Sequence, residues 1–145
     1  MKILFICTGN TCRSPMAEVI AKEHFRRNHL SHKVLSAGLH ATGDLPASEN
    51  ARDAIAELDL NLEGHRNRHA DRQLLEEADL VLTMTQDQRD LLRMAYFDLY
   101  GGVQKIRTLG TQDIEDPFFA DMDTYRKVRD QIKELIENTN WEESQ

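Results

Sequence analysis

Short apolar runs alternate along this chain with longer segments in which apolar residues recur every three or four positions. Four apolar runs are predicted to be β-strands, at residues 3–6, 34–38, 80–84 and 106–109. Four longer segments have the periodicity of amphipathic helices, at residues 16–24, 51–58, 88–96 and 125–136. Strands that alternate with helices are typical of a parallel sheet covered by helices on both faces. The pattern therefore predicts an α/β fold in three layers, with a four-stranded parallel sheet flanked by helices.

This architecture also predicts where a ligand binds. In open parallel sheets, ligands bind beyond the carboxyl ends of the strands, at the point where the strand order reverses. The segment after the first strand, residues 7–14, is the candidate for that place. Toward the other end of the chain, Asp121 is predicted to cap the last helix, and residues 141–145 form a polar tail that we expect to fray.

Residues 7–14 read Cys-Thr-Gly-Asn-Thr-Cys-Arg-Ser and have the composition of an anion-binding loop. Ser14 is a natural helix N-cap and Pro15 suits the first helical position, so we expect the helix to begin there. Gly9 and Asn10 are the residues that most readily adopt a positive φ. They allow successive N–H groups to turn toward one anion, while the dipole of the following helix adds positive potential. A dianionic phosphate fits this loop.

Two side chains of the loop add reactivity. The guanidinium of Arg13 offers paired donors to two phosphate oxygens. The same charge and the helix N-terminus favour the thiolate form of Cys7, which makes it a candidate nucleophile. A buried cysteine is often only a small apolar residue, and Cys7 with Cys12 has the spacing of half a zinc site. However, the chain has no other cysteine, its six histidines form no convincing zinc-binding pair, and the common glycine-rich nucleotide-binding motifs are absent.

The segment from Cys7 to Arg13 has the Cys-x5-Arg signature of cysteine-dependent phosphatases. Its place near the N-terminus, with Gly-Asn-x-Cys-Arg-Ser-Pro following, resembles the low-molecular-weight protein tyrosine phosphatases. The length, the motif order and the pair Asp116-Pro117 match too, so the resemblance covers essentially the whole chain. It implies a cysteinyl-phosphate intermediate on Cys7, with no metal and no organic cofactor. It also implies a phosphate-binding set formed by Thr8, Gly9, Asn10, Thr11, Cys12, Arg13 and Ser14.

The resemblance assigns acid–base chemistry to Asp116, in the acidic loop 113–119. Phosphoryl transfer to sulfur needs a proton for the leaving group, and then a base for the attacking water. One carboxyl group above the phosphate can do both. Pro117 would fix the backbone, and Phe118 or Phe119 would form a wall of the substrate cleft. Without the N-terminal motif, the same loop would be interpreted as a solvated acidic turn that initiates the last helix.

Supporting residues are assigned through the same resemblance. Asn10, Ser14, Ser36 and His65 resemble the hydrogen-bonded network of the family, in which the serine hydroxyl of position 14 faces the sulfur. This serine would stabilise the thiolate when it leaves the phosphoenzyme. His65 has a second interpretation, as a surface histidine beside the basic stretch 66–72.

Cys12 also has two interpretations. It follows the loop close to Cys7, so under oxidation the two could form a reversible disulfide that protects the nucleophile from irreversible oxidation. Alternatively, it is a packed free thiol. We favour the redox role, as regulation only.

Thr11 bears on the identity of the substrate. Tyrosine-directed members of the family commonly carry an aliphatic residue at this place, whereas threonine resembles the bacterial members that hydrolyse phosphoarginine. A hydroxyl beside the nucleophile suits a polar guanidinium, and a hydrogen bond discriminates more sharply than a methyl group does. The Asp-Pro-Phe wall also departs from the tyrosine-containing version common in tyrosine-directed relatives. The resemblance therefore favours phosphoarginine over phosphotyrosine.

Two other functions are consistent with the loop. Arsenate reductases share the fold, but their thioredoxin-coupled forms need a distal cysteine pair, and no cysteine follows Cys12. Glutathione or mycothiol could replace that pair. The second alternative is a phosphoprotein-binding module that has lost turnover. The intact Cys7, Arg13 and Asp116 argue against it.

Composition narrows the setting of this chemistry. With 145 residues, 40% of them hydrophobic and 30% charged, the chain 1–145 is expected to be a single phosphatase domain with its own core. The formal net charge of −7 argues against nucleic acid or an anionic membrane as partner. No apolar run approaches the ~20 residues of a membrane span, and two cysteines make no disulfide framework, so we expect a cytoplasmic protein. Its expected partner is a phosphorylated protein substrate, and a monomer is the default.

Overall fold

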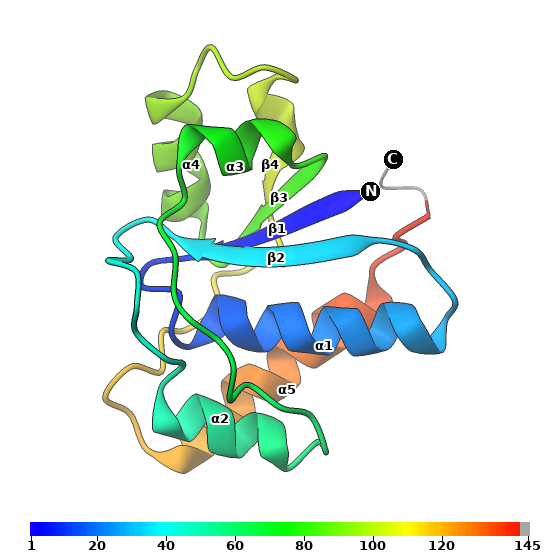
Figure 1. The fold of residues 1–145 in the computed structure, drawn as a ribbon, viewed down its shortest axis with the longest axis vertical. Helices are drawn as coiled ribbons and strands as arrows, with labels where there is room; N and C mark the ends of the chain where they lie inside the picture. The colour runs from blue at the N-terminus through cyan, green and yellow to red at the C-terminus, as the bar shows by residue number, and fades with distance from the viewer. Residues whose placement is uncertain (143–145) are drawn as a thin grey trace.

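A computed structural model describes residues 1–142 of the chain, and one parallel sheet lies at its centre (Figure 1). The strands lie in the order β2-β1-β3-β4, and every neighbouring pair is parallel. Their bounds are Lys2–Cys7 for β1, Lys33–Gly38 for β2, Leu80–Thr83 for β3 and Ile106–Thr108 for β4. The predicted four-stranded parallel sheet is confirmed, and each strand end lies within one residue of its predicted position.

Helices cover both faces of this sheet. Their bounds are Arg13–Arg27 for α1, Glu49–Ala56 for α2, Arg72–Glu77 for α3, Gln86–Ala95 for α4 and Met122–Asn138 for α5, with a short 3-10 helix η1 at Val103–Lys105. In Figure 1, α1, α2 and α5 lie on one face of the sheet, and α3 and α4 lie on the other. The predicted three-layer α/β architecture is therefore confirmed.

The central strand β1 is buried on both sides. Ile3 and Phe5 pack into the core that β1 shares with α1, α2 and α5, whereas Leu4 and Ile6 pack into the core on the side of α3 and α4. A strand buried on both faces requires an unbroken apolar sequence, which is what residues 3–6 provide. Because two packed layers hold β1, its carboxyl end is a rigid support for the loop that follows.

One helical prediction is corrected, and one helix was missed. The helix expected over residues 51–58 is α2, but it begins at Glu49 and ends at Ala56, so Leu58 lies outside it. Helix α3 was not predicted at all. It is a single short helix whose one buried residue is Leu75, so it has no apolar periodicity that could distinguish it from the polar sequence around it.

The segment after α5 does not fray as predicted. Trp141 is only 2% exposed, and its indole Nε1 donates a hydrogen bond to the carbonyl of Ile136 at 2.8 Å. Its ring meets the ring of Phe25 edge-on, with the centroids 5.0 Å apart. Trp141 therefore completes the core between α1 and α5, and the prediction was wrong for this residue. The last residues of the predicted tail, 143–145, lie outside the described residues.

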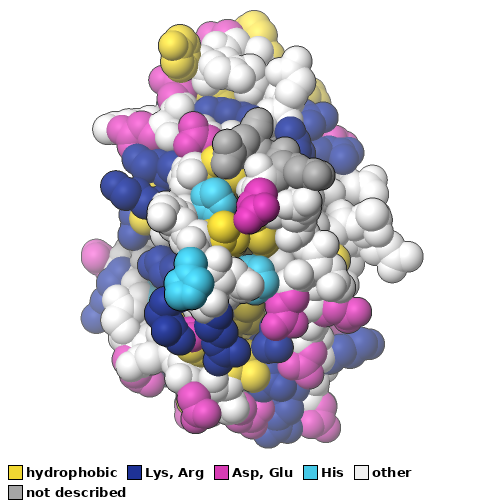
Figure 2. Space-filling view, turned by 90° about the vertical axis from the view of Figure 1, so that its right-hand side faces the viewer, with side chains coloured by type: hydrophobic (Ala, Val, Ile, Leu, Met, Phe, Trp, Pro, Cys, Tyr) yellow, Lys and Arg dark blue, Asp and Glu magenta, His cyan; other side chains and the backbone are white. Residues whose placement is uncertain are grey.

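Acidic and basic side chains are interspersed on the face where the amino ends of the strands lie (Figure 2). Ion pairs also occur within helices, for example Lys133 with Glu137 at 3.0 Å on α5. Exposed pairs of this kind contribute only a few tenths of a kcal/mol each. Within residues 1–142, no helix is both long and apolar enough to cross a bilayer.

Candidate active site

The loop between β1 and α1 surrounds the sulfur of Cys7, which is 3% exposed. The backbone N–H of Asn10 donates to Cys7 Sγ at 3.3 Å, and Ser14 Oγ lies 2.9 Å from the same atom. When the sulfur is a thiolate, the Ser14 hydroxyl must be the donor of that contact. These donors and the N-terminus of α1 direct positive potential toward the sulfur. The geometry is compatible with the nucleophilic role expected of Cys7.

Asn10 holds the loop in shape from its centre. It is fully buried and has φ 58, so it adopts the left-handed conformation that asparagine tolerates better than most residues. Its Nδ2 donates to Ser14 Oγ at 2.8 Å and to Ser36 Oγ at 3.0 Å, while its Oδ1 accepts the backbone N–H of Arg68 at 2.9 Å. His65 Nε2 donates to its carbonyl at 2.8 Å. Ser36 and His65 thus lie where the resemblance placed them, in contact with Asn10.

Two local predictions about the loop are wrong. Ser14 is not the N-cap, because α1 already begins at Arg13, and Pro15 is therefore its third residue. Cys12 occupies the cap position without a capping hydrogen bond. The Ser14 hydroxyl cannot cap the helix because Asn10 and the sulfur of the nucleophile engage it.

The positive φ that was expected at both Gly9 and Asn10 is found only at Asn10. The glycine that the loop requires sterically is instead Gly38, at the end of β2. A Cβ on Gly38 would lie 2.8 Å from the carbonyl oxygen of Thr8 and 2.9 Å from the backbone nitrogen of Asn10. Gly38 therefore allows β2 to pack directly against the loop. This requirement is invisible in the sequence because it depends on a contact between distant segments.

Arg13 connects the loop to the segment that carries Asp116. Its guanidinium is 4% exposed, and Nη1 donates to the carbonyl of Ile114 at 2.8 Å. Its Nη2 lies 3.5 Å from Asp116 Oδ2, and the backbone N–H of Phe118 donates to Asp116 Oδ1 at 3.1 Å. The Asp116 side chain is 51% exposed, so water and a leaving group can both reach it. The structure thus brings Cys7, Arg13 and Asp116 to one place, although more than 100 residues separate the first from the last.

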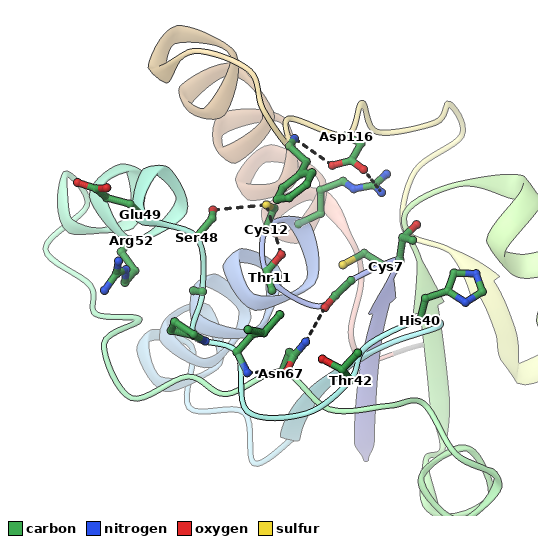
Figure 3. A pocket seen from close by; sticks show the side chains of 17 residues that line it. Cys7, Thr11, Cys12, His40, Thr42, Ser48, Glu49, Arg52, Asn67 and Asp116 are labelled. Atoms are coloured by element: carbon green, nitrogen blue, oxygen red, sulfur yellow. Dashed lines mark hydrogen bonds and ion pairs between the residues drawn. The ribbon is translucent and has the colours of Figure 1, made fainter.

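A pocket of about 540 Å³ opens above these residues (Figure 3). Its floor is formed by loop residues, among them Thr8, Gly9 and Thr11, and Asp116 stands at its side. Phe118 lines the pocket, as predicted for a cleft wall. Phe119 does not line it and is 93% exposed. The centroid of its ring lies 4.1 Å from that of Phe118, so the two rings pack against each other.

Comparison with known proteins identifies the family of this chain. Residues 2–143 match the family model described as low molecular weight phosphotyrosine protein phosphatase. The chain belongs to this family. It is therefore a protein phosphatase, and catalysis by a cysteine is general in the family.

Individual relatives of this phosphatase differ in the substrate that their names specify. A protein-arginine-phosphatase of Bacillus subtilis (strain 168) is 37% identical over 139 residues, which cover 94% of this chain and 92% of the relative. The low molecular weight protein-tyrosine-phosphatase PtpB of Staphylococcus epidermidis is 35% identical over 142 residues, which cover 94% and 95%. A solved structure of the YwlE arginine phosphatase, a C7S mutant with a phosphorylated active site serine, matches with a TM-score of 0.89 at 35% identity, covering 94% of this chain and 91% of that one.

The second cysteine of this phosphatase has polar partners that the sequence did not indicate. Cys12 Sγ lies 3.3 Å from Tyr125 Oη and 3.4 Å from Ser48 Oγ, and Ser48 Oγ donates to Tyr125 Oη at 3.2 Å. Burial, followed by the hydrogen bond with Cys12, raises the pKa of Tyr125 to about 12, so this phenol stays protonated at neutral pH. Both cysteines are free thiols. Cys12 thus lies beside the hydroxyl groups of Ser48, the N-cap of α2, and Tyr125 on α5.

Several residues that support the site were missed by the sequence analysis. Glu18 on α1 accepts the hydroxyl of Ser36 at 2.6 Å, which extends the Asn10 network along the first helix. Asn67 donates from Nδ2 to the carbonyl of Gly9 at 3.3 Å. Gln88 donates from Nε2 to the side chain of Thr8 at 3.1 Å. Only Gln88 had a local signal, since it is the fourth residue of the Thr-x-x-Gln pattern of a capping box.

Proposed function

We propose that this phosphatase hydrolyses phosphoarginine in proteins through a cysteinyl-phosphate on Cys7. The observation that carries this proposal is the position of Thr11, which places a hydroxyl in the lining of the pocket that holds Cys7, Arg13 and Asp116. The substrate side chain enters this pocket with its phosphoryl group against the loop. The similarity to the protein-arginine-phosphatase of Bacillus subtilis supports the same conclusion.

The proposed first step is an in-line attack of the Cys7 thiolate on phosphorus. The loop N–H groups and the guanidinium of Arg13 bind the three equatorial oxygens, and their positive potential stabilises the charge of the transition state. The bond from phosphorus to the leaving nitrogen breaks as Asp116 gives that nitrogen its proton. The products are a guanidinium, which keeps its positive charge because its nitrogen receives the proton of Asp116, and cysteinyl-phosphate. A phosphorylated active site serine in the C7S mutant of YwlE supports phosphoryl transfer to this position.

The second step releases phosphate. Asp116, now a carboxylate, takes a proton from a water molecule that attacks phosphorus from the side the guanidine has left. The bond between sulfur and phosphorus breaks, and the electron pair returns to Cys7. Ser14, 2.9 Å from the sulfur, donates its hydroxyl hydrogen to the departing thiolate. Asp116 ends the cycle protonated and Cys7 ionised, which is the starting state.

The preference for phosphoarginine is proposed from hydrogen bonding. A guanidinium is planar and offers only donors, so it is recognised by acceptor groups in the wall of a pocket. Thr11 Oγ1 and the carbonyl oxygen of the protonated Asp116 carboxyl group are such acceptors close to the nucleophile. A phenol ring at the same place forms no hydrogen bond with Thr11 except through its ester oxygen. Replacing this hydroxyl by a methyl group therefore affects phosphoarginine more than phosphotyrosine.

Variants of Thr11 test the substrate preference. We compare kcat/KM for phosphoarginine and phosphotyrosine peptides of the same sequence in the wild type and in Thr11→Val, Thr11→Ser and Thr11→Ile. Val has the shape of Thr without the hydroxyl, and Ser keeps the hydroxyl. We expect Val and Ile to lower the ratio of arginine to tyrosine activity by about tenfold or more, and Ser to preserve it.

Cys7→Ser serves as the reference without turnover in this comparison. If the wild type prefers phosphotyrosine, the substrate assignment is wrong and the tyrosine phosphatase named by the Staphylococcus epidermidis relative is the better description. If Val and Ser behave alike, the hydroxyl of Thr11 does not select the substrate.

A further inference from the structure

Gln88, near the start of α4, contacts Thr8 in the loop between β1 and α1, and three hydrogen bonds fix the orientation of its side-chain amide. The side chain is 6% exposed. Its Oε1 accepts the backbone N–H groups of Met84 at 2.9 Å and Thr85 at 3.1 Å, and its Nε2 donates to Thr8 Oγ1 at 3.1 Å. A flipped amide would direct its NH2 group at two backbone donors, so only the observed orientation satisfies the network. Gln88 is therefore always a donor toward Thr8.

This orientation determines what the Thr8 hydroxyl can do. A hydroxyl carries one hydrogen, and because Thr8 Oγ1 accepts from Gln88, that hydrogen remains available for another acceptor. Accepting one hydrogen bond also makes the hydroxyl a stronger donor. Within residues 1–142, no protein atom accepts the hydroxyl hydrogen of Thr8. Thr8 follows Cys7 in the sequence, and both residues line the pocket.

We propose that Gln88 is a positioning residue that sets Thr8 as a hydrogen-bond donor to an acceptor oxygen of the phosphorylated substrate. Two sources of that oxygen are compatible with the place of Thr8 in the pocket. One is the phosphoryl group itself, and the other is a carbonyl of the substrate backbone at the rim of the pocket. This inference rests on the proposed phosphatase site, but not on whether the substrate is phosphoarginine or phosphotyrosine, because both carry these oxygens.

The substitution Gln88→Glu reverses the polarity of this contact. A carboxylate still accepts the two backbone N–H groups, so the structural role of Gln88 at the start of α4 is retained. It offers no donor, however, and so Thr8 must turn its hydrogen toward Glu and away from the pocket. Thr8→Val removes the hydroxyl and keeps the shape of the side chain. Thr8→Ser keeps the hydroxyl.

The experiment measures kcat and KM for a phosphopeptide and the dissociation constant of inorganic phosphate. These values are compared among the wild type, the three single variants and the double variant Gln88→Glu/Thr8→Val. We expect Gln88→Glu and Thr8→Val each to raise KM about threefold to tenfold and to change kcat less than about twofold. This result is typical when a variant loses a contact that is equally strong in the bound substrate and in the transition state. The double variant should be no worse than Thr8→Val alone, and Thr8→Ser, which keeps the hydroxyl, should raise KM less than Thr8→Val does. Gln86→Glu adds the same charge at an exposed position of α4 and should leave KM unchanged.

The dissociation constant of inorganic phosphate distinguishes the two possible acceptor oxygens. If the dissociation constant of phosphate rises together with KM, Thr8 contacts the phosphoryl group, and if KM alone rises, Thr8 contacts the substrate backbone. The inference is overturned if KM is unchanged in Gln88→Glu, or if Gln88→Glu raises it equally in the Thr8→Val background, which would reveal an effect of charge alone. If the wild type binds phosphate but does not turn over the phosphopeptide, the proposed function is refuted instead. The dissociation constants of phosphate in the variants would still test the role of Thr8.

Discussion

At the scale of single residues, the site depends on side chains that each satisfy several partners at once. Asn10 is the clearest case, because one buried amide donates to two hydroxyl groups and accepts one backbone N–H. The oxygen of Ser14 accepts from this amide, which leaves its hydrogen available for the sulfur of Cys7. Gln88 orients Thr8 by the same logic. In each case, the hydrogen bonds that a polar side chain makes with one partner determine which of its atoms remains available to the next.

Asp121 gives a pH prediction at this scale. It caps α5, as its sequence predicts, by accepting the hydroxyl of Thr124 at 2.7 Å and the backbone N–H of the same residue at 2.9 Å. These hydrogen bonds, that of the hydroxyl first, lower the pKa of Asp121. A carboxyl group whose folded pKa is lowered binds its proton more tightly in the unfolded chain. Its stabilising effect is therefore present above the unfolded pKa of about 3.9 and is lost as pH falls through the lower folded value.

The variant Asp121→Asn keeps a capping oxygen but cannot ionise. We expect the wild type to exceed this variant in its free energy of unfolding at pH 7, and the difference to shrink between about pH 5 and pH 2. Urea unfolding at a series of pH values measures this difference. A difference that stays constant down to pH 2 would show that the charge of Asp121 does not contribute.

At the scale of secondary structure, the sequence predicted those elements whose apolar pattern is local. The four strands were found to within one residue at each end because buried parallel strands have continuous apolar sequences. The composition of the loop between β1 and α1 could be interpreted from the sequence because its residues lie next to each other in the chain. By contrast, α3 buries one residue only, and the contacts of Cys12 with Tyr125 and of Thr8 with Gln88 join residues 113 and 80 positions apart. No local pattern encodes such pairs.

The turn after α5 gives a prediction at the element scale. Trp141 is buried against Phe25, and its indole is hydrogen-bonded, so Trp141→Ala removes packing between α1 and the end of α5. We expect a loss of about 3–5 kcal/mol in the free energy of unfolding, as for other large aromatic residues removed from a core. Chemical denaturation measures this loss. Tyr100→Ala is the matched control, because this aromatic side chain is 80% exposed, and its removal should change the free energy by less than about 0.5 kcal/mol.

At the scale of the whole molecule, the site is where segments from the entire chain converge. The loop after β1 supplies Cys7, the end of β2 supplies Ser36 and Gly38, and the segment before α5 supplies Asp116. Arg13 joins the first and last of these through its hydrogen bond to Ile114 and its contact with Asp116. With a net charge of −7, the molecule as a whole repels anions, so the proposed binding of phosphate depends on this local arrangement of donors.

This convergence predicts that phosphate stabilises the folded protein as a whole. A ligand that binds only the folded state adds about 2.7 kcal/mol to the free energy of unfolding at 100 times its dissociation constant, which corresponds to a rise in Tm of roughly 5–10 °C for a chain of this size. Thermal unfolding with and without phosphate measures this rise, with potassium chloride at equal ionic strength as the control.

Two variants test whether phosphate binds at the proposed site. Cys7→Ser should retain most of the rise in Tm, because binding uses the loop and Arg13 more than the nucleophile. Arg13→Lys should lose most of it, since an ammonium group cannot hold two phosphate oxygens in one plane. An equal rise in Arg13→Lys, or an equal rise with potassium chloride, would mean that phosphate acts elsewhere on the molecule.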